Sequence, residues 1–166
     1  MNLNHQFAVR AAQPGEVAVL HGLLLRAFAE YTGKLDPPSG ANDETVDSLG
    51  RRLGEGGAFL CLSNQSDAEL SIPVGCVFYA AKSDHLYVGR LSVPPEFRKR
   101  GIGDLLLART EAHAATLGLP SVRLRVRLAL ETLREYYAAR GYAPIGLHKH
   151  AGYTEPTFVE MEKRLQ

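Results

Sequence analysis

Three basic residues and two glycines stand together near the middle of the chain, where a loop is expected to lead into a helix. Residues 98–103 read Arg-Lys-Arg-Gly-Ile-Gly. Glycines at such a junction let backbone N–H groups converge, because no Cβ atom obstructs them. The first turn of a helix adds unpaired N–H donors and a partial positive charge. This combination is typical of a site for phosphate oxygens.

Two common nucleotide-binding motifs are excluded at this position. A P-loop requires Gly-Lys-Ser/Thr after a four-residue gap, and the sequence lacks it. A dinucleotide-binding fingerprint requires a third glycine, but Leu106 stands at that position. The residues alone leave two interpretations, a phosphate-binding loop or a solvated basic turn at the start of a helix.

The elements that must position this loop are read from hydrophobic periodicity and from breaks at glycine and proline. Helices are expected at 17–31, 43–53, 101–117 and 131–140. Strands are expected at 7–11, 58–62, 72–81, 85–93 and 122–128, with two weaker ones at 143–148 and 158–163. No repeat or linker is found, so residues 1–166 are expected to form one domain, a mixed α/β sandwich rather than a doubly wound sheet.

The basic loop resembles a known motif. Arg98-x-x-Gly101-x-Gly103 resembles the acetyl-CoA pyrophosphate motif of the GNAT superfamily of N-acetyltransferases, Gln/Arg-x-x-Gly-x-Gly/Ala. That family places the motif between a strand ending in Val-x-Pro and a helix, and Val93, Pro94 and Arg98 fall in those places.

A second family element follows at the expected distance. Tyr137, Gly141 and Tyr142 match Tyr-x-x-x-Gly-Phe/Tyr at the end of the next helix, and the two motifs together span residues 85–143. The resemblance implies a GNAT-like acyl-CoA N-acyltransferase fold in the α/β class. Its mixed sheet is mostly antiparallel, with helices on both faces and a splay between the fourth and fifth strands.

The resemblance also implies how acetyl-CoA binds. In the family the pantetheine arm fills the splay, and the backbones of Leu91 and Val93 would bond it like an added strand. The N–H of Val93 would donate to the thioester carbonyl, and the amides of residues 99–104 would hold the pyrophosphate. The cofactor-binding residues implied are Leu91, Ser92, Val93, Arg98, Lys99, Arg100, Gly101, Ile102, Gly103 and Asp104.

Tyr137 occupies the position of the family's general acid. A phenol has a pKa of roughly 10, close to that of an alkyl thiol, so a tyrosine can protonate the departing sulfur. The alternative for Tyr137 is a packing aromatic, which is also the interpretation for its neighbour Tyr136. Two positions depart from the family pattern, since Leu130 replaces an asparagine that bonds the cofactor arm and Tyr87 replaces a glutamate base.

The attacking amine must lose a proton, and the sequence leaves the base open. The candidates are Asp84, His85, His148, His150, Glu30 and Glu155. His148 and His150 alternate across Lys149, but the chain has no HExxH and no cysteine pair at ligand spacing, so no metal is expected.

Two charged groups of residues give opposite indications about the acceptor. Arg123, Arg125 and Arg127 alternate along one expected strand and therefore share one face. They suit ion pairs with acids on a helix above, an exposed face, an anionic group of substrate or cofactor, or a dimer contact. The acids around the first loop suit a cationic amine or a solvated loop; they are Glu30, Asp36, Asp43 and Glu44.

Composition bounds the remaining possibilities. Of 166 residues, 45% are hydrophobic and 22% charged, as in a globular protein, and the net charge of +1 gives no electrostatic signature for nucleic acid or a membrane. Residues 1–10 contain no apolar leader, and the two cysteines, Cys61 and Cys76, lie in apolar strand contexts and suit a reducing compartment. A cytoplasmic location is expected.

The resulting hypothesis is an N-acetyltransferase that transfers acetyl from acetyl-CoA directly to a primary amine on a small molecule or a protein. A homodimer is a further possibility. Two alternatives stay open: transfer of another acyl group or to oxygen, and a CoA-binding sensor or interaction module that has lost catalysis.

Overall fold

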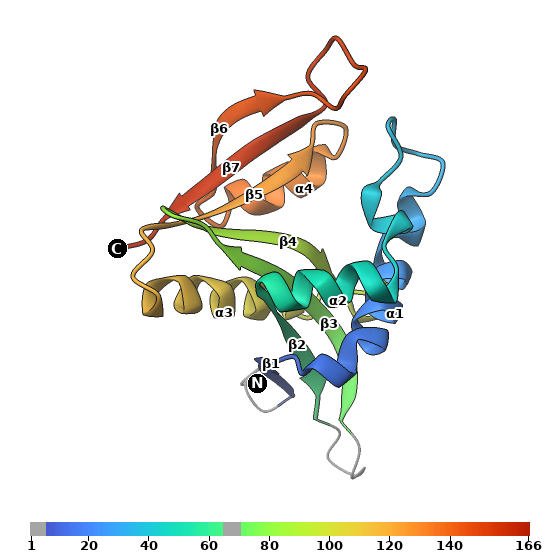
Figure 1. Ribbon diagram of the computed structural model, residues 1–166, viewed down its shortest axis with the longest axis vertical. Helices are drawn as coiled ribbons and strands as arrows, with labels where there is room; N and C mark the ends of the chain where they lie inside the picture. The colour runs from blue at the N-terminus through green and yellow to red at the C-terminus, as the bar shows by residue number, and fades with distance from the viewer. Residues whose placement is uncertain (1–5, 65–70) are drawn as a thin grey trace.

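The computed structural model describes residues 6–64 and 71–166 of the chain, and a seven-stranded sheet runs through this part of it (Figure 1). The strand order is β1-β2-β3-β4-β5-β7-β6. The strands are β1 (Phe7–Ala11), β2 (Gly57–Ser63), β3 (Ile72–Ala81), β4 (Leu86–Ser92), β5 (Ser121–Arg127), β6 (Ala143–His148) and β7 (Phe158–Arg164).

Four α-helices accompany these strands within the described ranges: α1 (Val17–Phe28), α2 (Val46–Glu55), α3 (Ile102–Thr116) and α4 (Glu131–Ala138). Each matches a helix expected from periodicity, with shifted ends. The second helix begins only at Val46 because Thr45 caps it: the Thr45 hydroxyl accepts from the Ser48 N–H at 3.0 Å, and the Ser48 hydroxyl accepts from the Thr45 N–H at 2.8 Å.

The sheet is mixed. Every pairing among the described strands is antiparallel except that of β4 with β5, which is parallel and is connected through α3. The parallel pairing consists of Leu86 opposite Val122 and Tyr87 opposite Arg123, and beyond these pairs the two strands separate. The predicted fold class, including the splay between the fourth and fifth strands, is confirmed.

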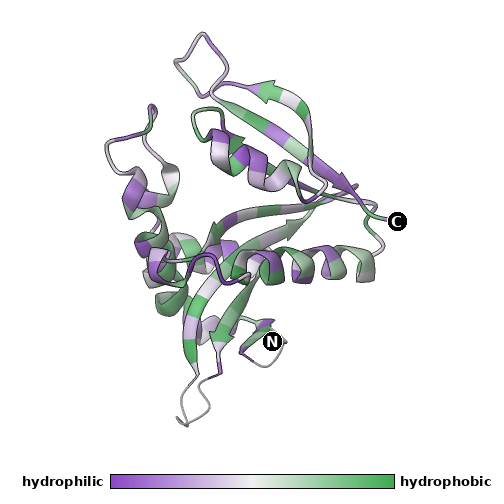
Figure 2. Cartoon of the chain, turned by 180° about the vertical axis from the view of Figure 1, so that it is seen from behind, coloured by the Kyte–Doolittle hydropathy of each residue, from purple (hydrophilic) through white to green (hydrophobic). Residues whose placement is uncertain are grey.

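Alternating side chains of the sheet form two cores. One face packs against α1 and α2, where Leu20 and Leu24 meet Leu60, Cys76 and neighbours. The other packs against α3 and α4, where Ile102, Leu106 and Tyr137 meet Val74, Val122 and neighbours. In Figure 2 the central strands are mostly hydrophobic, whereas the helices carry both hydrophilic and hydrophobic residues, as expected for helices with one buried face.

Candidate active site

The loop that precedes α3 presents a row of free backbone donors. Lys99 has φ 61° and Gly101, the N-cap of α3, has φ 80°, both in the left-handed region. These turns direct successive amides to one side, as in an anion-binding nest. In the described part of the chain, no N–H of residues 99–104 donates to a backbone carbonyl; the first amide of α3 that does so is that of Leu105, bonded to Gly101 O at 3.1 Å.

Arg98, the first residue of the motif, directs its side chain away from this loop. Its Nε donates to the Val93 carbonyl at 2.9 Å, its Nη1 lies 2.7 Å from Glu30 Oε1, and its Nη2 donates to the Ala27 carbonyl at 3.0 Å. Arg98 thus fixes the end of β4 against the end of α1. The N–H of Arg98 is also used, since it donates to the Pro95 carbonyl at 3.2 Å, so neither its side chain nor its amide is free for a ligand at the loop. Lys99 and Arg100, in contrast, are exposed and form no ion pair with a described carboxylate.

Tyr136 of α4 and Arg140, which follows that helix, meet the start of α3. The hydroxyl of Tyr136 donates to Asp104 Oδ1 at 2.7 Å, and a Cβ placed on Gly103 would lie 2.6 Å from that hydroxyl. The guanidinium of Arg140 bonds both oxygens of Asp104 and lies 3.5 Å from the Tyr136 ring centroid. The contact of Tyr136 and Arg140 with Asp104 is not predictable from the sequence, because nothing in the spacing of α3 and α4 indicates which of their faces meet.

Tyr137 lies in the core that α3 and α4 form against the sheet. Its ring is 7% exposed and packs edge-on against Tyr136 and Tyr142, with centroids 5.3 and 5.8 Å away. Burial raises the pKa of Tyr137, and charge on Tyr136, Tyr31 or Tyr87 would raise it further. The phenol therefore keeps its proton at neutral pH.

The second half of β4 is irregular. A β-bulge interrupts the β3–β4 register between Cys76/Ser92 and Phe78/Gly89, and Arg90 within it has φ 55°. Past Tyr87, the edge of β4 that faces β5 has no strand partner, so Leu91, Ser92 and Val93 lie along the opening. The Ser92 side chain is buried, and its hydroxyl donates to the Arg90 carbonyl at 2.8 Å, which leaves backbone rather than side chain to meet a ligand there.

The loop between α1 and α2 (residues 32–45) lies beside this opening and is held from three sides. Arg90 of β4 bonds Glu44 Oε1 with Nη2 at 3.1 Å, and Arg127 of β5 donates to the Pro37 carbonyl at 2.5 Å. The Tyr153 hydroxyl, from the loop between β6 and β7, donates to Asp36. Figure 1 shows the α1–α2 loop beside the ends of β5 and α4.

The candidate bases are dispersed. Asp84 and His85 pair with each other at 2.7 Å at the joined end of β4 and β5, whereas Glu30 is paired with Arg98. His148 stacks on Phe158, and His150 bonds the Thr157 hydroxyl. Burial and the charge of Arg127 lower the pKa of His150, which favours its neutral form. Glu155 is exposed in the β6–β7 loop.

The cysteines lie inside the two cores. Cys61 and Cys76 are fully buried, and burial raises their pKa to about 11 and about 12. Both thiols therefore stay protonated at neutral pH, which suits core residues rather than nucleophiles.

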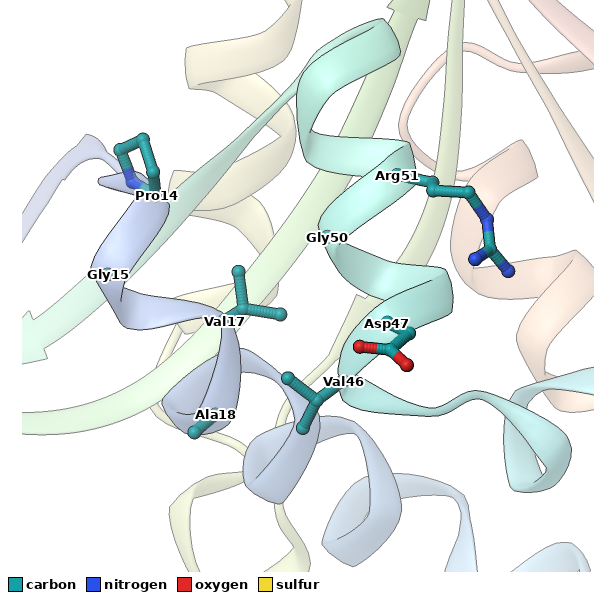
Figure 3. Close-up of a pocket in the computed structure, with 8 residues that line it drawn as sticks. All are labelled: Pro14, Gly15, Val17, Ala18, Val46, Asp47, Gly50 and Arg51. Atoms are coloured by element: carbon teal, nitrogen blue, oxygen red, sulfur yellow. The ribbon is translucent and has the colours of Figure 1, made fainter.

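Two hollows lie away from this site. One, with a volume of about 630 Å³, lies between α1 and α2. Figure 3 shows residues that line it, among them Val17, Val46 and Asp47. A second, of about 420 Å³, lies at the β6–β7 loop beside His148 and Phe158. Neither includes Tyr137 or the loop before α3, so the site is recognised by its free backbone groups rather than by a cavity.

The family comparison agrees with this geometry. The sequence model of the acetyltransferase (GNAT) family matches residues 24–142, a range that contains the loop before α3, the opening and Tyr137. The chain belongs to the GNAT acetyltransferase family. No curated protein is similar enough to match this GNAT chain.

Solved structures of GNAT acetyltransferases share the fold. The ribosomal-protein-S18-alanine N-acetyltransferase from Escherichia coli superposes with a TM-score of 0.73 at 13% identity, covering 95% of this chain and 93% of that one. PaiA N-acetyltransferase from Thermoplasma acidophilum, in complex with coenzyme A, gives 0.72 at 15% identity, covering 96% and 99%. A GNAT acetyltransferase from Elizabethkingia anophelis with acetyl-CoA bound gives 0.69 at 16%, covering 96% and 99%.

The described ranges of this GNAT chain contain neither a membrane-spanning helix nor a metal-binding group of side chains. No helix in the described ranges is long and apolar enough to cross a membrane. Among the same residues, no group of three or more His, Cys, Asp or Glu side chains is arranged to hold a metal ion.

Proposed function

We propose that the protein transfers an acetyl group from acetyl-CoA to a primary amine by direct attack. The observation that carries the proposal is the parting of β4 and β5 after Tyr87 and Arg123, with unpaired amides of residues 99–104 beside it. Free strand edges suit an extended amide-containing arm, and a nest at a helix start suits a pyrophosphate. The residues present therefore fit acetyl-CoA, whose thioester supplies the activated acetyl group.

The chain's own residues would then divide the work. The backbones of Leu91 and Val93 bind and orient the arm, and the Val93 N–H donates to the carbonyl oxygen as negative charge develops on it. Arg98 holds this segment in place through its bond to the Val93 carbonyl. The hydroxyl of Tyr137 gives its proton to the sulfur that leaves.

A catalytically lapsed CoA-binding module is the second candidate. It is favoured by Leu130 and Tyr87, which remove an asparagine and a glutamate present in many GNAT proteins. The presence of Tyr137, buried at the position of the family's general acid, favours the enzyme instead.

Thermal unfolding with graded acetyl-CoA tests the proposal. A ligand at 100 times its Kd adds about 2.7 kcal/mol, which corresponds to roughly 5–10 °C for a domain of this size. We expect a saturable rise in Tm for the wild type and none for Gly101→Val, because a β-branched residue cannot adopt φ 80° and its side chain would cover the amides. Absence of any rise in the wild type would overturn the proposal.

Gly118→Val is the matched control. Gly118 lies at the other end of α3 with φ 72°, and a Cβ added there meets nothing within 4 Å. Both substitutions therefore impose similar backbone strain on the same helix. The Gly118 variant should lose stability but keep the acetyl-CoA-dependent rise in Tm, and loss of that rise in both variants would show that strain alone is responsible.

A further inference from the structure

The three arginines that alternate along β5 have different partners. Arg123 forms ion pairs with three acids, Glu162 at 3.1 Å, Asp84 at 3.3 Å and Glu160 at 3.9 Å. Arg125 lies 3.4 Å from Glu160. Arg127 forms no ion pair with any carboxylate in the described ranges. The acids that pair with its neighbours are Glu160 and Glu162 of β7 and Asp84 just before β4, and none of them lies on a helix.

Most of the acids of the first loop are also occupied. Glu30 pairs with Arg98 at 2.7 Å, and Glu44 is buried between Arg52 at 2.7 Å and Arg90 at 3.1 Å. Asp36 accepts from the Tyr153 hydroxyl. Asp43 is exposed. The sequence left open whether the arginines of β5 or the acids of the first loop bind the acceptor. Of these two groups, the partly buried residue without an ionic partner is Arg127, and its charge is positive.

Arg127 stands where an acceptor would approach. It ends β5 on the same sheet face as Tyr87, and it lies between the α1–α2 loop, whose Pro37 carbonyl it bonds, and the β6–β7 loop, where its charge lowers the pKa of His150. Burial lowers the pKa of Arg127, although Tyr153 and Asp36 oppose this effect. Partial burial of a cation costs free energy, which an anionic ligand would recover.

A guanidinium has five N–H donors in a planar fork that fits a carboxylate. Among the described residues, the guanidinium of Arg127 makes one hydrogen bond, from Nη2 to the Pro37 carbonyl. We propose that the acceptor carries a carboxylate in addition to its amine, and that Arg127 binds this carboxylate. The inference rests on the proposed acetyl transfer and specifies which amines it serves.

Acetyl transfer to matched pairs of amines tests the inference. The panel contains α-amino acids and ω-amino acids of increasing length, each beside its carboxamide, together with polyamines and short peptides with amidated C-termini. Released thiol is the readout. We expect acids to be acetylated with a kcat/KM about 10- to 100-fold above that of their amides, as the loss of a charge-assisted hydrogen-bonded pair predicts.

Variants assign the preference to a residue. Arg127→Gln should raise KM for the accepted acid about 10- to 100-fold while KM for acetyl-CoA stays unchanged, and Arg127→Lys should restore part of the loss. Arg125→Gln is the control, since it removes the same charge from the same face of β5 at a residue already close to Glu160. It should leave the acid–amide preference intact.

The outcomes separate this inference from the proposed function. If acetyl-CoA neither raises Tm nor donates to any amine, the proposed function itself fails. If acetyl-CoA binds but the accepted amines lack a carboxylate, or no acid in the panel is acetylated, the carboxylate inference fails alone. It also fails if Arg127→Gln leaves the preference unchanged.

Discussion

The guanidinium of Arg140 bonds both carboxylate oxygens of Asp104, with Nε 2.5 Å from Oδ1 and Nη2 3.2 Å from Oδ2. Asp104 is in the first turn of α3, and its amide is the last in the row of unpaired amides. A bare carboxylate there would repel a pyrophosphate, so Arg140 neutralises the one acid in that first turn. The pairing lowers the pKa of Asp104 and keeps it ionised, which makes the compensation by Arg140 permanent at neutral pH.

Replacement of Arg140 should therefore weaken acetyl-CoA binding. We expect Arg140→Ala to raise the Kd for acetyl-CoA about ten-fold with little change in kcat, since one unpaired charge close to the phosphates is worth on the order of 1–2 kcal/mol. Asp104→Asn in the same background should restore the affinity. Titration calorimetry measures both, with Arg109→Ala, farther along α3, as a control of equal charge change; unchanged affinity in Arg140→Ala contradicts the prediction.

Tyr137→Phe should slow turnover while binding persists. Removal of a general acid typically costs 10²- to 10⁴-fold, and the ring that fills the core is retained. The measurement is kcat at saturating acetyl-CoA, together with the Tm rise that acetyl-CoA produces. Tyr136→Phe is the neighbouring control: its hydroxyl bonds Asp104, so we expect a change in acetyl-CoA affinity rather than in kcat. Equal kcat in wild type and Tyr137→Phe would remove Tyr137 from the mechanism.

The pH dependence of turnover follows from the same phenol. Because burial raises the pKa of Tyr137 above its ordinary value of 10.0, the acid stays protonated through neutral and moderately alkaline pH. The rate should rise with pH as the amine loses its proton, and no decline assignable to Tyr137 should occur below about pH 10. A kcat profile measured with an acceptor of known pKa decides this, and a fall near pH 8 that disappears in Tyr137→Phe would contradict it.

Glu44 should govern part of the stability. Burial alone would raise its pKa, but the hydrogen bond from Ser48 and the charges of Arg52 and Arg90 outweigh burial, so the pKa of Glu44 lies below 4.5. Glu44→Ala leaves Arg90 without its acid and should cost about 2–3 kcal/mol, less than a fully buried pair because Arg52 is 43% exposed. Urea unfolding measures the loss, with Asp47→Asn in the first turn of α2 as an exposed control.

The sign of the pH effect is fixed by that lowered pKa. The folded protein binds the Glu44 proton more weakly than the unfolded chain does, so the carboxylate stabilises the fold above pH 4.5. This contribution disappears as the pH falls through the lowered pKa of the folded state. The difference in unfolding free energy between wild type and Glu44→Ala should therefore shrink at acidic pH; a constant difference would contradict the assignment.

Local signals in the sequence were sufficient for the helices and strands and for the turn that begins α3. Periodicity located α1 and α3, and the glycines at 101 and 103 marked the start of α3. The sequence did not reveal partners across elements. The sequence left open whether Arg123 and Arg125 pair with acids on a helix. Their partners are Glu160 and Glu162 on β7 together with Asp84, and the pairing of β5 with β7 depends on tertiary packing. Tyr136, expected only to pack, reaches Asp104 for the same reason.

β4 and β5 pair over only two residues each, so the facing edges of these two strands lie inside the sheet without backbone partners among the described strands. Most sheets confine such edges to their outermost strands, where charge, bulges or short length prevents another chain from adding on. Here the Arg90 bulge and the α1–α2 loop, tied down by Arg90, Arg127 and Tyr153, protect them. The contacts that we propose to border the acceptor's path therefore also hinder another chain from pairing with these strand edges.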